Sequence, residues 1–348
     1  MIFPTGSTPR SLCILRLSAI GDICHVLPVV RTLQHYWPQT QLTWIIGKLE
    51  HSLIGDIPGI EFIIFDKSKG LTAYHHLYQQ LRGRRFDVLL HMQMSLRASL
   101  ASMLIPANTR LGFDRQRAKD LQWIFTNKQI PHIDKQHVMD SFFGFIETLG
   151  IRERILTWDI PISEFTRKQL GNILPETPYI VISPCSSMPY RNWTIEGYAA
   201  VADYIAEKYH RPIVLSGAPS AIEKEFGEKI SARCRQKPVN LIGKTTLKEL
   251  LAVIDGAELL IAPDSGPAHM ATAVNTPVIG LYACTNPDRA RPYLSAKYIV
   301  NRYPEAVKAK YGKTVANIPW GSRVRDPDTM TRITNDDVKI ILDQLLKK

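Results

Sequence analysis

A single carboxylate, Asp22, stands where an apolar run gives way to a helical pattern. The stretch is LRLSAIGDICHVLPVVRTL, in which Asp22 follows Gly21, between an apolar run over 12–17 and a helix expected over 23–36. Glycine permits a tight turn and the close approach of a substrate to the backbone. The carboxylate could be a helix N-cap, or a general base that takes a proton from a substrate. From the residues alone, the cap is the better supported role.

A second polar turn lies in APDSGPAHMATA, residues 262–273. Asp264, Ser265 and Gly266 follow an apolar run and precede a small-residue helix, with Pro267 at a favourable first-turn position. Free backbone N–H groups at such a turn suit a phosphate. A lone histidine is usually structural, but the adjacent Asp-Ser-Gly turn makes ligand contact at least equally well supported for His269.

A third candidate is the segment SPCSSMPYRNWTIEGY, residues 183–198. Ser186 and Ser187 are followed by Arg191, after an expected strand and before an expected helix. Hydroxyls and a guanidinium could bind a diphosphate at a helix N-terminus. Taken alone, the segment could equally be an ordinary polar loop.

Basic side chains gather in the first half of the chain. HMQMSLR and LGFDRQRAKD contribute Arg97, Arg115, Arg117 and Lys119. These charges could form a solvated face, or they could hold an anionic acceptor.

Short β-rich runs alternate with helical patterns along the chain, which predicts parallel α/β sheets. The expected strands are SLCILRL, QLTWIIG, EFIIFD, DVLLHMQ, 179–184, 212–217, 239–243, 259–264 and 277–282, and the expected helices are 23–36, 73–83, 194–209, 220–236, 246–255 and 267–274. We expect Pro28 either in the first turn of its helix or at a kink. The stretch 151–178, with three prolines, is predicted to link two doubly wound domains. Ligands bind such sheets beyond the carboxyl ends of the strands, where the motifs lie.

The last part of the chain is less regular. Residues 300–333 are rich in Lys, Arg, Tyr and Pro, and the tail NDDVKIILDQLLKK predicts a helix capped by Thr334 or Asn335 and ended by lysines.

The composition limits the function classes. A net charge of +11 favours a polyanionic partner such as nucleic acid, an anionic membrane or a phosphorylated substrate, although a basic surface without a role is an alternative. The charge is dispersed, unlike a nucleic-acid-binding tail. Five scattered cysteines argue against a disulfide framework or zinc site and fit a reducing compartment. There is no GxGxxG, GxxxxGK[ST] or GxSxG motif.

The sequence shows neither a membrane-spanning segment nor a signal peptide, the two features that would indicate another compartment. No run approaches the ~20 apolar residues of a spanning helix, and the first ten residues, MIFPTGSTPR, lack the apolar core of a signal peptide. We therefore expect a cytoplasmic protein.

Together, these segments resemble the ADP-heptose:lipopolysaccharide heptosyltransferases of the inverting glycosyltransferase family 9. The resemblance covers nearly the whole chain and rests on LRLSAIGDICHVLPVVRTL, SSMPYRNW and GKTTLKELLAVIDGAELLIAPDSGPAHMATAVNTPVIGLYACTNP. An N-terminal Gly-Asp loop paired with D-[ST]-G-x-x-H is its most specific feature. It implies the GT-B fold, in which two doubly wound Rossmann-like α/β domains face each other across a cleft.

The resemblance also implies a domain layout. It comprises an N-terminal acceptor-binding domain over 1–165, a nucleotide-sugar domain over 166–333, and a C-terminal helix over 334–348 that packs back on the N-terminal domain.

The resemblance assigns a role to each matching residue. Asp22 corresponds to the catalytic base. The donor-binding positions are Ser186, Ser187, Arg191, Glu223, Asp264, Ser265, Gly266 and His269, and the acceptor-binding positions are Gly21, Arg97, Arg115, Arg117 and Lys119. The family often has lysine where Arg191 stands, and arginine keeps the charge but changes the geometry.

The implied activity is inverting transfer of heptose from ADP-L-glycero-D-manno-heptose to Kdo of the lipopolysaccharide inner core, with no metal or other cofactor. The 300–333 segment suggests the heptosyltransferase I type, which acts on a single Kdo with or without a phosphate. The implied partners are ADP-heptose, Kdo–lipid A and the anionic cytoplasmic face of the inner membrane, and not nucleic acid. Heptosyltransferase II or a later family member is the alternative, and a non-catalytic nucleotide- or polyanion-binding protein is a weaker one.

Overall fold

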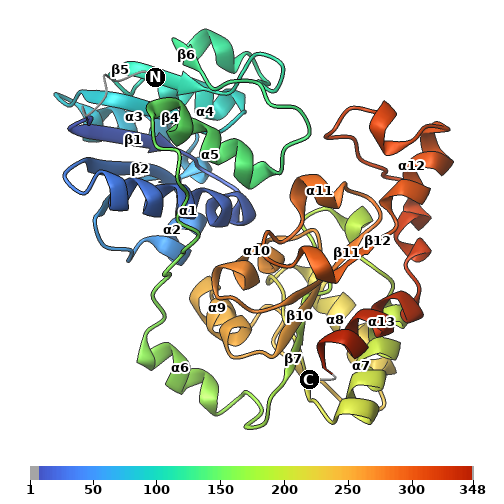
Figure 1. The fold of residues 1–348 in the computed structure, drawn as a ribbon. Helices are drawn as coiled ribbons and strands as arrows, with labels where there is room; N and C mark the ends of the chain where they lie inside the picture. Colours follow the sequence, from blue (N-terminus) through green and yellow to red (C-terminus); the bar gives the residue numbers. More distant parts are fainter. Residues whose placement is uncertain (1–7, 347–348) are drawn as a thin grey trace. The chain divides into compact units, whose positions relative to one another are not determined.

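The chain forms two compact units, Met1–Pro161 and Ile162–Lys348, which we call the first and second units (Figure 1). The computed structural model describes residues 8–346. Most of the first ten residues, MIFPTGSTPR, which were expected not to form a signal peptide, and the two terminal lysines of the tail lie outside the described residues. Each unit is a layered α/β domain with its own sheet and core.

The first unit is built on a six-stranded sheet in the order β3-β2-β1-β4-β5-β6, with all neighbouring strands parallel. Its strands are β1 (Ser11–Leu15), β2 (Gln41–Gly47), β3 (Ile60–Phe65), β4 (Phe86–His91), β5 (Ala107–Gly112) and β6 (Lys128–Gln129). Its helices are α1 (Ile20–Tyr36), α2 (Lys48–Ile54), α3 (Leu71–Leu81), α4 (Leu96–Ser102) and α5 (Val138–Leu149), with 3-10 turns η1 (Lys67–Lys69) and η2 (Gln122–Phe125). This strand order is that of a doubly wound nucleotide-binding fold.

The sheet of the second unit has the order β12-β11-β10-β7-β8-β9, again with all neighbouring strands parallel. Read from β9 to β12, this order is the same as that of the first sheet read from β3 to β6, so the second unit repeats the topology. Its strands are β7 (Ile180–Ile182), β8 (Ile213–Leu215), β9 (Val239–Asn240), β10 (Leu259–Pro263), β11 (Val278–Tyr282) and β12 (Ile299–Asn301). Its helices are α6 (Glu164–Gly171), α7 (Ile195–Tyr209), α8 (Ala221–Arg233), α9 (Leu247–Asp255), α10 (Gly266–Ala273), α11 (Pro287–Ala290), α12 (Tyr303–Tyr311) and α13 (Asn335–Leu345), with 3-10 turns η3 (Pro189–Arg191), η4 (Ala296–Tyr298), η5 (Val315–Asn317) and η6 (Pro327–Arg332). The expectation of two doubly wound domains is confirmed.

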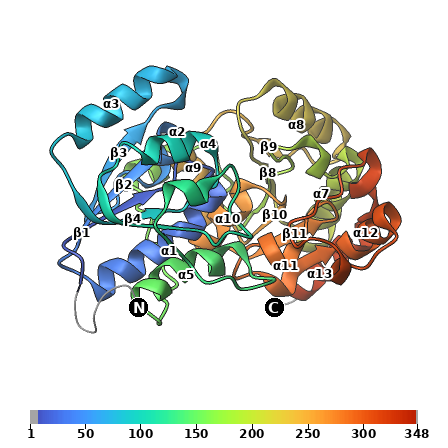
Figure 2. The same cartoon turned by 90° about the horizontal axis from the view of Figure 1, so that it is seen from above.

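Helices cover both faces of each sheet, which is why the central strands are continuously apolar. In the first unit, α3 and α4 pack on one face, and α1 and α5 pack together on the other (Figure 2). In the second unit, α7, α8 and α13 share one core with the sheet. The carboxyl ends of the strands are left to loops, where the candidate residues lie.

Helix α1 continues through an internal proline. It begins at Ile20, three residues before the expected start, so Pro28 lies well inside it and not in its first turn. A proline has no N–H for the carbonyl four residues earlier. That carbonyl, of Cys24, instead accepts a 2.7 Å hydrogen bond from the indole N–H of Trp158. A side chain from the end of the first unit thus replaces the missing backbone bond.

Two segments differ from expectation. The supposed linker 151–178 contains α6, which contacts α9. Residues 300–333 contain α12, whose Tyr303 and Val307 form a small core with Val324. None of the helices in residues 8–346 is long and apolar enough to cross a bilayer.

The C-terminal helix α13 also differs from expectation. We expected it to pack back on the N-terminal domain, but its buried Val338 and Leu342 lie in the core of the second unit, and it contacts α7. The physical reason is that the apolar face of α13 is buried against apolar side chains of α7 and the sheet of the second unit. Thr334 is its N-cap, in a capping box with Asp337.

Candidate active site

Asp22 lies in the first turn of α1, beyond the carboxyl end of β1. It is not the N-cap, which is Ala19; it is three residues further on, and its Oδ2 accepts the backbone N–H of Ala19 at 3.4 Å. The same oxygen forms an ion pair with Arg16. Within the described chain Oδ1 has no partner, and the side chain is 33% exposed. One carboxylate oxygen is therefore available to a substrate.

Arg16 is one residue of the candidate site that the sequence analysis did not identify. Its side chain is 10% exposed, its Nη1 donates to the carbonyl of Met92 at 2.6 Å, and its guanidinium lies 5.3 Å from the ring centroid of Phe142. Because these contacts fix the guanidinium, they also fix the Asp22 carboxylate that it holds. Arg16 could have been recognised in the sequence, because it is a charged residue within an apolar strand run, six positions before Asp22.

Gln93 ties the Asp22 loop to the end of the neighbouring strand β4. Its side-chain oxygen accepts the backbone N–H of Leu17 at 2.6 Å, and its amide donates to the Ser18 hydroxyl at 3.3 Å. Gly21 lies between this anchored segment and Asp22 and is partly exposed. The loop that carries the candidate base is therefore braced from two strands.

Two further titratable groups lie at the carboxyl ends of the strands beside β1. Burial raises the pKa of Glu50, in the first turn of α2. Burial, together with nearby Arg110, lowers the pKa of His91 to about 3, so this histidine is neutral. His91 ends β4 and pairs in register with Leu15 of β1. In both groups, burial disfavours the charged form.

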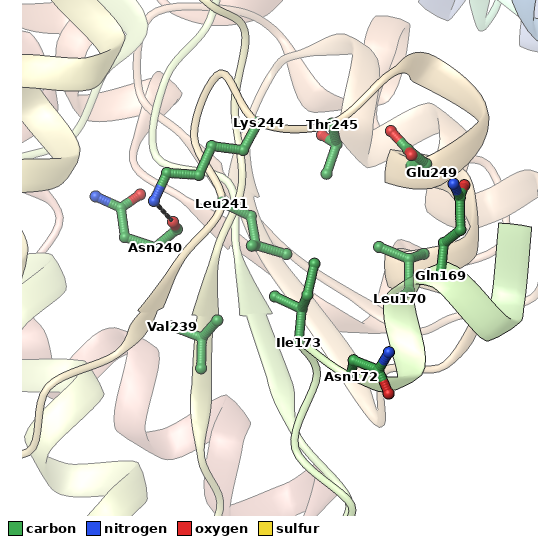
Figure 3. Close-up of a pocket in the computed structure, with 10 residues that line it drawn as sticks. All are labelled: Gln169, Leu170, Asn172, Ile173, Val239, Asn240, Leu241, Lys244, Thr245 and Glu249. Atoms are coloured by element: carbon green, nitrogen blue, oxygen red, sulfur yellow. Dashed lines mark hydrogen bonds between the residues drawn. The ribbon is translucent and has the colours of Figure 1, made fainter.

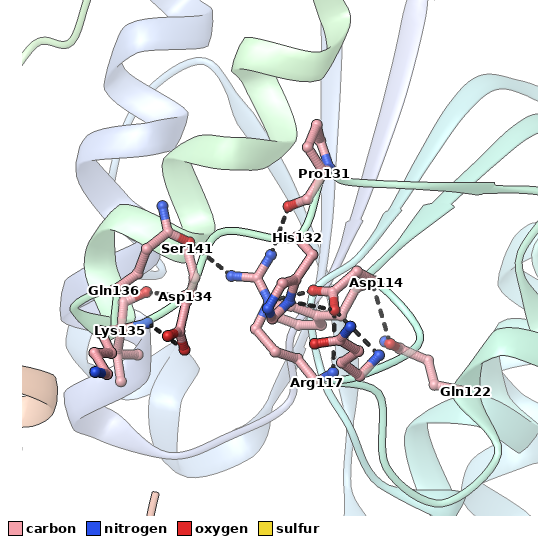
Figure 4. Close-up of polar contacts among 12 residues, drawn as sticks. Asp114, Arg117, Gln122, Pro131, His132, Asp134, Lys135, Gln136 and Ser141 are labelled. Atoms are coloured by element: carbon pink, nitrogen blue, oxygen red, sulfur yellow. Dashed lines mark hydrogen bonds and ion pairs between the residues drawn. The ribbon is translucent and has the colours of Figure 1, made fainter. Parts of the chain in front are cut away.

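The four predicted acceptor-side cations divide into two kinds. Arg97 and Lys119 are exposed, and Arg115 lies over the ring of Trp123 at 4.6 Å. Arg117 is committed to the fold: it forms an ion pair with Asp114 and donates to the Gln136 side chain at 2.7 Å and to the carbonyl of Pro131 at 2.8 Å (Figure 4).

The Asp114 network explains why Arg117 is held. Asp114 also contacts a ring nitrogen of His132 at 3.0 Å, and the adjacent cation lowers the pKa of its carboxyl group (Figure 4). The geometry favours a structural role for Arg117 over the expected contact with an acceptor.

The donor motif of the second unit centres on an ion pair. Nη1 of Arg191 lies 3.1 Å from Oδ2 of Asp264 and also donates to the carbonyl of Asp264 at 3.2 Å. The other carboxylate oxygen lies 3.9 Å from Nε2 of His269. The structure thus brings together Arg191 from η3 with Asp264 and His269 from the β10–α10 region. Nε of Arg191 is buried without a partner in the described chain and remains a donor for a ligand.

Ser265 and Gly266 begin helix α10. Ser265 is the N-cap, but its hydroxyl makes no capping bond and is buried without a partner among the described residues. Gly266 is the first helical residue, and Pro267 follows it as expected. An unused hydroxyl at the positive end of a helix suits a phosphate oxygen.

The two serines after β7 differ in availability. The Ser186 hydroxyl accepts the N–H of Met188 at 3.1 Å, and its backbone N–H donates to the side chain of Asn192 at 2.8 Å. Ser186 is therefore largely committed to its own loop. Ser187 is exposed, and its hydroxyl makes no contact within residues 8–346. Of the expected pair, Ser187 is the better placed to bind a ligand.

Glu223 lies in the first turn of α8, next to the loop after β8. Its Oε2 accepts the backbone N–H of Ala218 at 2.7 Å, and partial burial raises its pKa. Burial, and to a lesser extent the charge of Glu223, raises the pKa of Cys185, in the loop after β7, so the two loops are neighbours.

Two serines at strand ends were not predicted as site residues. Ser183 follows β7 and Ser216 follows β8, and both hydroxyls are buried without partners in the described part of the chain. Since β8, β7 and β10 are adjacent, these hydroxyls and that of Ser265 share one sheet edge. In the sequence, these residues could have been recognised as hydroxyl side chains that each follow one of three apolar strand runs.

A cavity of about 580 Å³ lies elsewhere in the second unit, between α6, β9 and the start of α9 (Figure 3). Leu170, Ile173 and Leu241 give it an apolar side, and Lys244 donates to the carbonyl of Asn240 at 2.9 Å beside it. None of the predicted donor residues lines this cavity. It is therefore separate from the Arg191–Asp264 cluster.

The described residues contain no group of three or more His, Cys, Asp or Glu side chains arranged to hold a metal ion. Beside the donor motif, the buried polar atoms named above as lacking a partner in the described chain are hydroxyls and a guanidinium nitrogen.

The fold defines a two-unit α/β protein with a doubly wound sheet in each unit, and polar clusters lie at the carboxyl ends of the strands. The family model for glycosyltransferase family 9 (heptosyltransferase) matches residues 74–318. The chain is 42% identical over 331 residues to the lipopolysaccharide core heptosyltransferase OpsX of Haemophilus influenzae, covering 95% of each chain. The chain belongs to glycosyltransferase family 9 and is a heptosyltransferase of that family.

Two further comparisons show the breadth of the likeness. The lipooligosaccharide heptosyltransferase 2 of Haemophilus influenzae is 32% identical over 318 residues, covering 87% of this chain and 91% of that one. The solved structure of the Escherichia coli heptosyltransferase WaaC with ADP has the same fold, with a TM-score of 0.72, 17% identity and coverage of 96% and 99%.

Proposed function

We propose that the chain transfers heptose from ADP-L-glycero-D-manno-heptose to Kdo of the lipopolysaccharide inner core, as a heptosyltransferase I. The observation that carries the proposal is the 42% identity, over 95% of both chains, to a lipopolysaccharide core heptosyltransferase. The donor is supported by the unused hydroxyls and the Arg191–Asp264 pair at the sheet edge of the second unit. The solved WaaC structure, which has the same fold and contains ADP, also supports a nucleotide donor.

Asp22 is the proposed general base. Its free Oδ1 would accept the proton of the acceptor hydroxyl, and the hydroxyl oxygen would form a bond to the anomeric carbon of heptose as the bond to ADP breaks. Attack opposite the leaving group inverts the configuration at that carbon. Arg16 would act as a positioning residue because it holds Oδ2 and leaves Oδ1 toward the substrate.

The donor diphosphate gains negative charge as it leaves. The guanidinium of Arg191, the N-terminal end of α10 and the hydroxyls of Ser187 and Ser265 are the groups that would stabilise that charge. Because these groups are fixed donors, the proposed mechanism uses no metal ion or further cofactor. Glu223, at the loop after β8, is the proposed ribose contact.

The acceptor side is proposed to use the exposed cations of the first unit. Kdo–lipid A carries phosphates and carboxylates, which Arg97 and Lys119 would attract. The net charge of +11 on the whole chain would favour the same anionic acceptor. An acceptor anchored in lipid places the proposed reaction at the cytoplasmic face of the inner membrane, with the enzyme as a peripheral protein.

A second candidate, heptosyltransferase II, is favoured by the 32% identity to a lipooligosaccharide heptosyltransferase 2. That enzyme type shares the donor and differs in the acceptor. The two candidates are therefore separated by acceptor alone.

The test is transfer from ADP-heptose to heptose-free Kdo–lipid A, with and without phosphate on Kdo, with the products weighed by mass spectrometry. Addition of one heptose to this acceptor supports the proposal, and the phosphate comparison defines the acceptor form. Transfer only to an acceptor that already carries heptose would overturn the type I assignment in favour of the second candidate. Binding of ADP without transfer to either acceptor would overturn both.

A further inference from the structure

Helix α4 in the first unit buries small side chains and exposes large apolar ones, the reverse of an ordinary amphipathic helix. Its buried positions hold small residues, Ala98, Ser99, Ala101 and Ser102. Its outward positions hold large apolar ones: Leu96 is 54% exposed and Leu100 is 42% exposed, and Met103, directly after the helix, is 64% exposed. The spacing of i, i+4 and i+7 aligns these three side chains on one face. A surface helix normally turns such residues toward the core.

The 3-10 turn η2 shows the same reversal. Its polar Gln122 is fully buried and donates to the carbonyl of His91 at 2.7 Å. The apolar neighbours point outward: Leu121 and Ile124 are each 57% exposed, and Trp123 is 37% exposed. Buried hydrogen bonds thus hold the turn with its apolar side chains in solvent.

The two reversed elements form one surface. They contact each other, and the carboxylate of Asp120, just before η2, accepts the backbone N–H of Leu96 at 3.2 Å. We call the surface the apolar patch; it consists of Leu96, Leu100, Met103, Leu121, Trp123 and Ile124. Contiguous exposed apolar side chains on a folded protein mark an interaction site.

Positive charge borders the apolar patch. Arg97 is next to Leu96 on α4, Lys119 precedes η2, and Arg115 lies over the Trp123 ring. The nearby carboxylate of Asp120 is already bonded to the backbone of α4. Large apolar side chains with a cationic border match the boundary between anionic headgroups and acyl chains.

We propose that the apolar patch docks the first unit on the surface of an anionic lipid bilayer, with its six side chains in the boundary between headgroups and acyl chains. The proposal rests on the proposed function in one respect, which is that the acceptor is a lipid. Docking would bring Arg97 and Lys119 to the level of the headgroups, where the sugar of that lipid begins. The apolar side chains provide the attachment, and the cations favour anionic over zwitterionic lipid.

Trp123 provides a direct readout, because Trp37, Trp44, Trp158 and Trp193 are buried. The full chain is mixed with phosphatidylglycerol-containing vesicles that carry brominated acyl chains and no acceptor. Bromine in the acyl region should quench the fluorescence of Trp123, and the quenching should disappear in Trp123→Phe but remain in Trp320→Phe. Quenching should be weak with phosphatidylcholine alone and should fall as salt rises.

The matched variants test the patch itself. The double variant Leu100→Gln with Ile124→Gln should bind vesicles about tenfold or more weakly in co-sedimentation, since the burial of apolar side chains drives insertion. Ile222→Gln/Ile340→Gln, which changes two exposed isoleucines of the second unit, should bind as the parent chain does. Transfer to a soluble, deacylated Kdo acceptor should be the same in all three proteins.

The outcomes separate the two proposals. Vesicle binding that is absent, or unaffected by the patch variant, overturns the docking proposal, whatever the enzyme activity. If the patch variant instead converts a dimer into a monomer and vesicles do not bind, the patch is an interface between copies and the proposal is wrong. Vesicle binding through the patch with no transfer to any Kdo acceptor leaves docking intact and overturns the proposed function.

Discussion

At the scale of single residues, the two carboxylate oxygens of Asp22 differ in their contacts. Oδ2 accepts the Ala19 N–H and pairs with Arg16, which fixes the start of α1 and the carboxylate together. Oδ1 has no contact in the described chain and can meet a hydroxyl. The structural contacts and the proposed role as a base do not compete, because each uses a different oxygen.

Asp22→Asn should lower kcat by about 10²–10⁴-fold, the usual contribution of a general base. Asparagine retains an oxygen that can accept the Ala19 N–H, so the fold should persist. ADP affinity, measured by calorimetry, should be unchanged because the proposed donor residues lie in the second unit. Turnover equal to the parent enzyme would remove Asp22 from the base role.

Arg191→Ala should weaken ADP binding by about 10- to 100-fold, because a charge-assisted hydrogen bond contributes about 1.5–3 kcal/mol. Arg191→Lys should restore part of the loss. Arg211→Ala is the matched control: this arginine of the second unit pairs with Glu258 and is not among the predicted donor residues. Equal loss of affinity in both alanine variants would contradict a specific donor contact.

His91 predicts a pH dependence of stability. Its pKa of about 3 in the folded chain lies far below the ordinary value of 6.5. The unfolded chain therefore binds a proton first, so stability is fully present above about pH 6.5 and is lost as the pH falls toward 3. Relative to His91→Asn, the parent chain should lose about 2 kcal/mol of unfolding free energy between pH 7 and pH 5. Urea unfolding of both proteins at the two pH values measures this, and parallel losses would show that His91 is not responsible.

At the scale of elements, α13 is a structural part of the second unit. Leu342 is fully buried in its core, whereas Ile340 on the same helix is 59% exposed. Leu342→Ala should cost about 2–5 kcal/mol through the cavity that it leaves. Ile340→Ala should cost less than about 0.5 kcal/mol in the same denaturant titration. Similar costs at both positions would mean that α13 does not pack as described.

Elements with a strong local signal were predictable from the sequence. The apolar run QLTWIIG predicted β2 over its full length. The start of α7 was also predicted correctly, because Thr194 is its N-cap. Helix α6 was missed because only Leu170 is buried on it, so its pattern lacks an apolar face. The packing of α13 could not be predicted, because an amphipathic helix does not specify which apolar surface covers it.

The candidate site was predictable only where a motif carries it. The turn Asp264–Gly266 is contiguous in sequence and was found. Arg16 was missed because its role depends on the carbonyl of Met92, which is 76 residues away. The commitment of Arg117 could not be predicted either, because its ion pair with Asp114 is not visible in the sequence.

At the scale of the whole molecule, each unit has its own sheet and core, and the proposed chemical roles are divided between them. The candidate base lies in the first unit, and the candidate donor groups lie in the second. The identical strand order of the two sheets places both sets at the carboxyl ends of central strands. Ligand binding to one set should therefore be detectable separately from the other.

ADP at about 100 times its Kd should stabilise the unit that binds it by about 2.7 kcal/mol. Hydrogen exchange with mass spectrometry should show the largest added protection in 183–192, 216–223 and 264–269. These segments hold the Arg191–Asp264 pair and the unused hydroxyls. Largest protection within residues 8–161 would instead assign the nucleotide to the first unit.

The indole of Trp158 has a consequence for biosynthesis. The ribosome makes α1 early, yet the carbonyl that Pro28 leaves open is not satisfied until Trp158 has been added. Nearby, Arg31 also donates to the backbone of Trp158 and Asp159. At about 5–20 residues per second, the nascent first unit stays incomplete for roughly 10–30 s. It can close only as the ribosome starts on the second unit, so the helix that bears the candidate base is translated well before the residue that secures it.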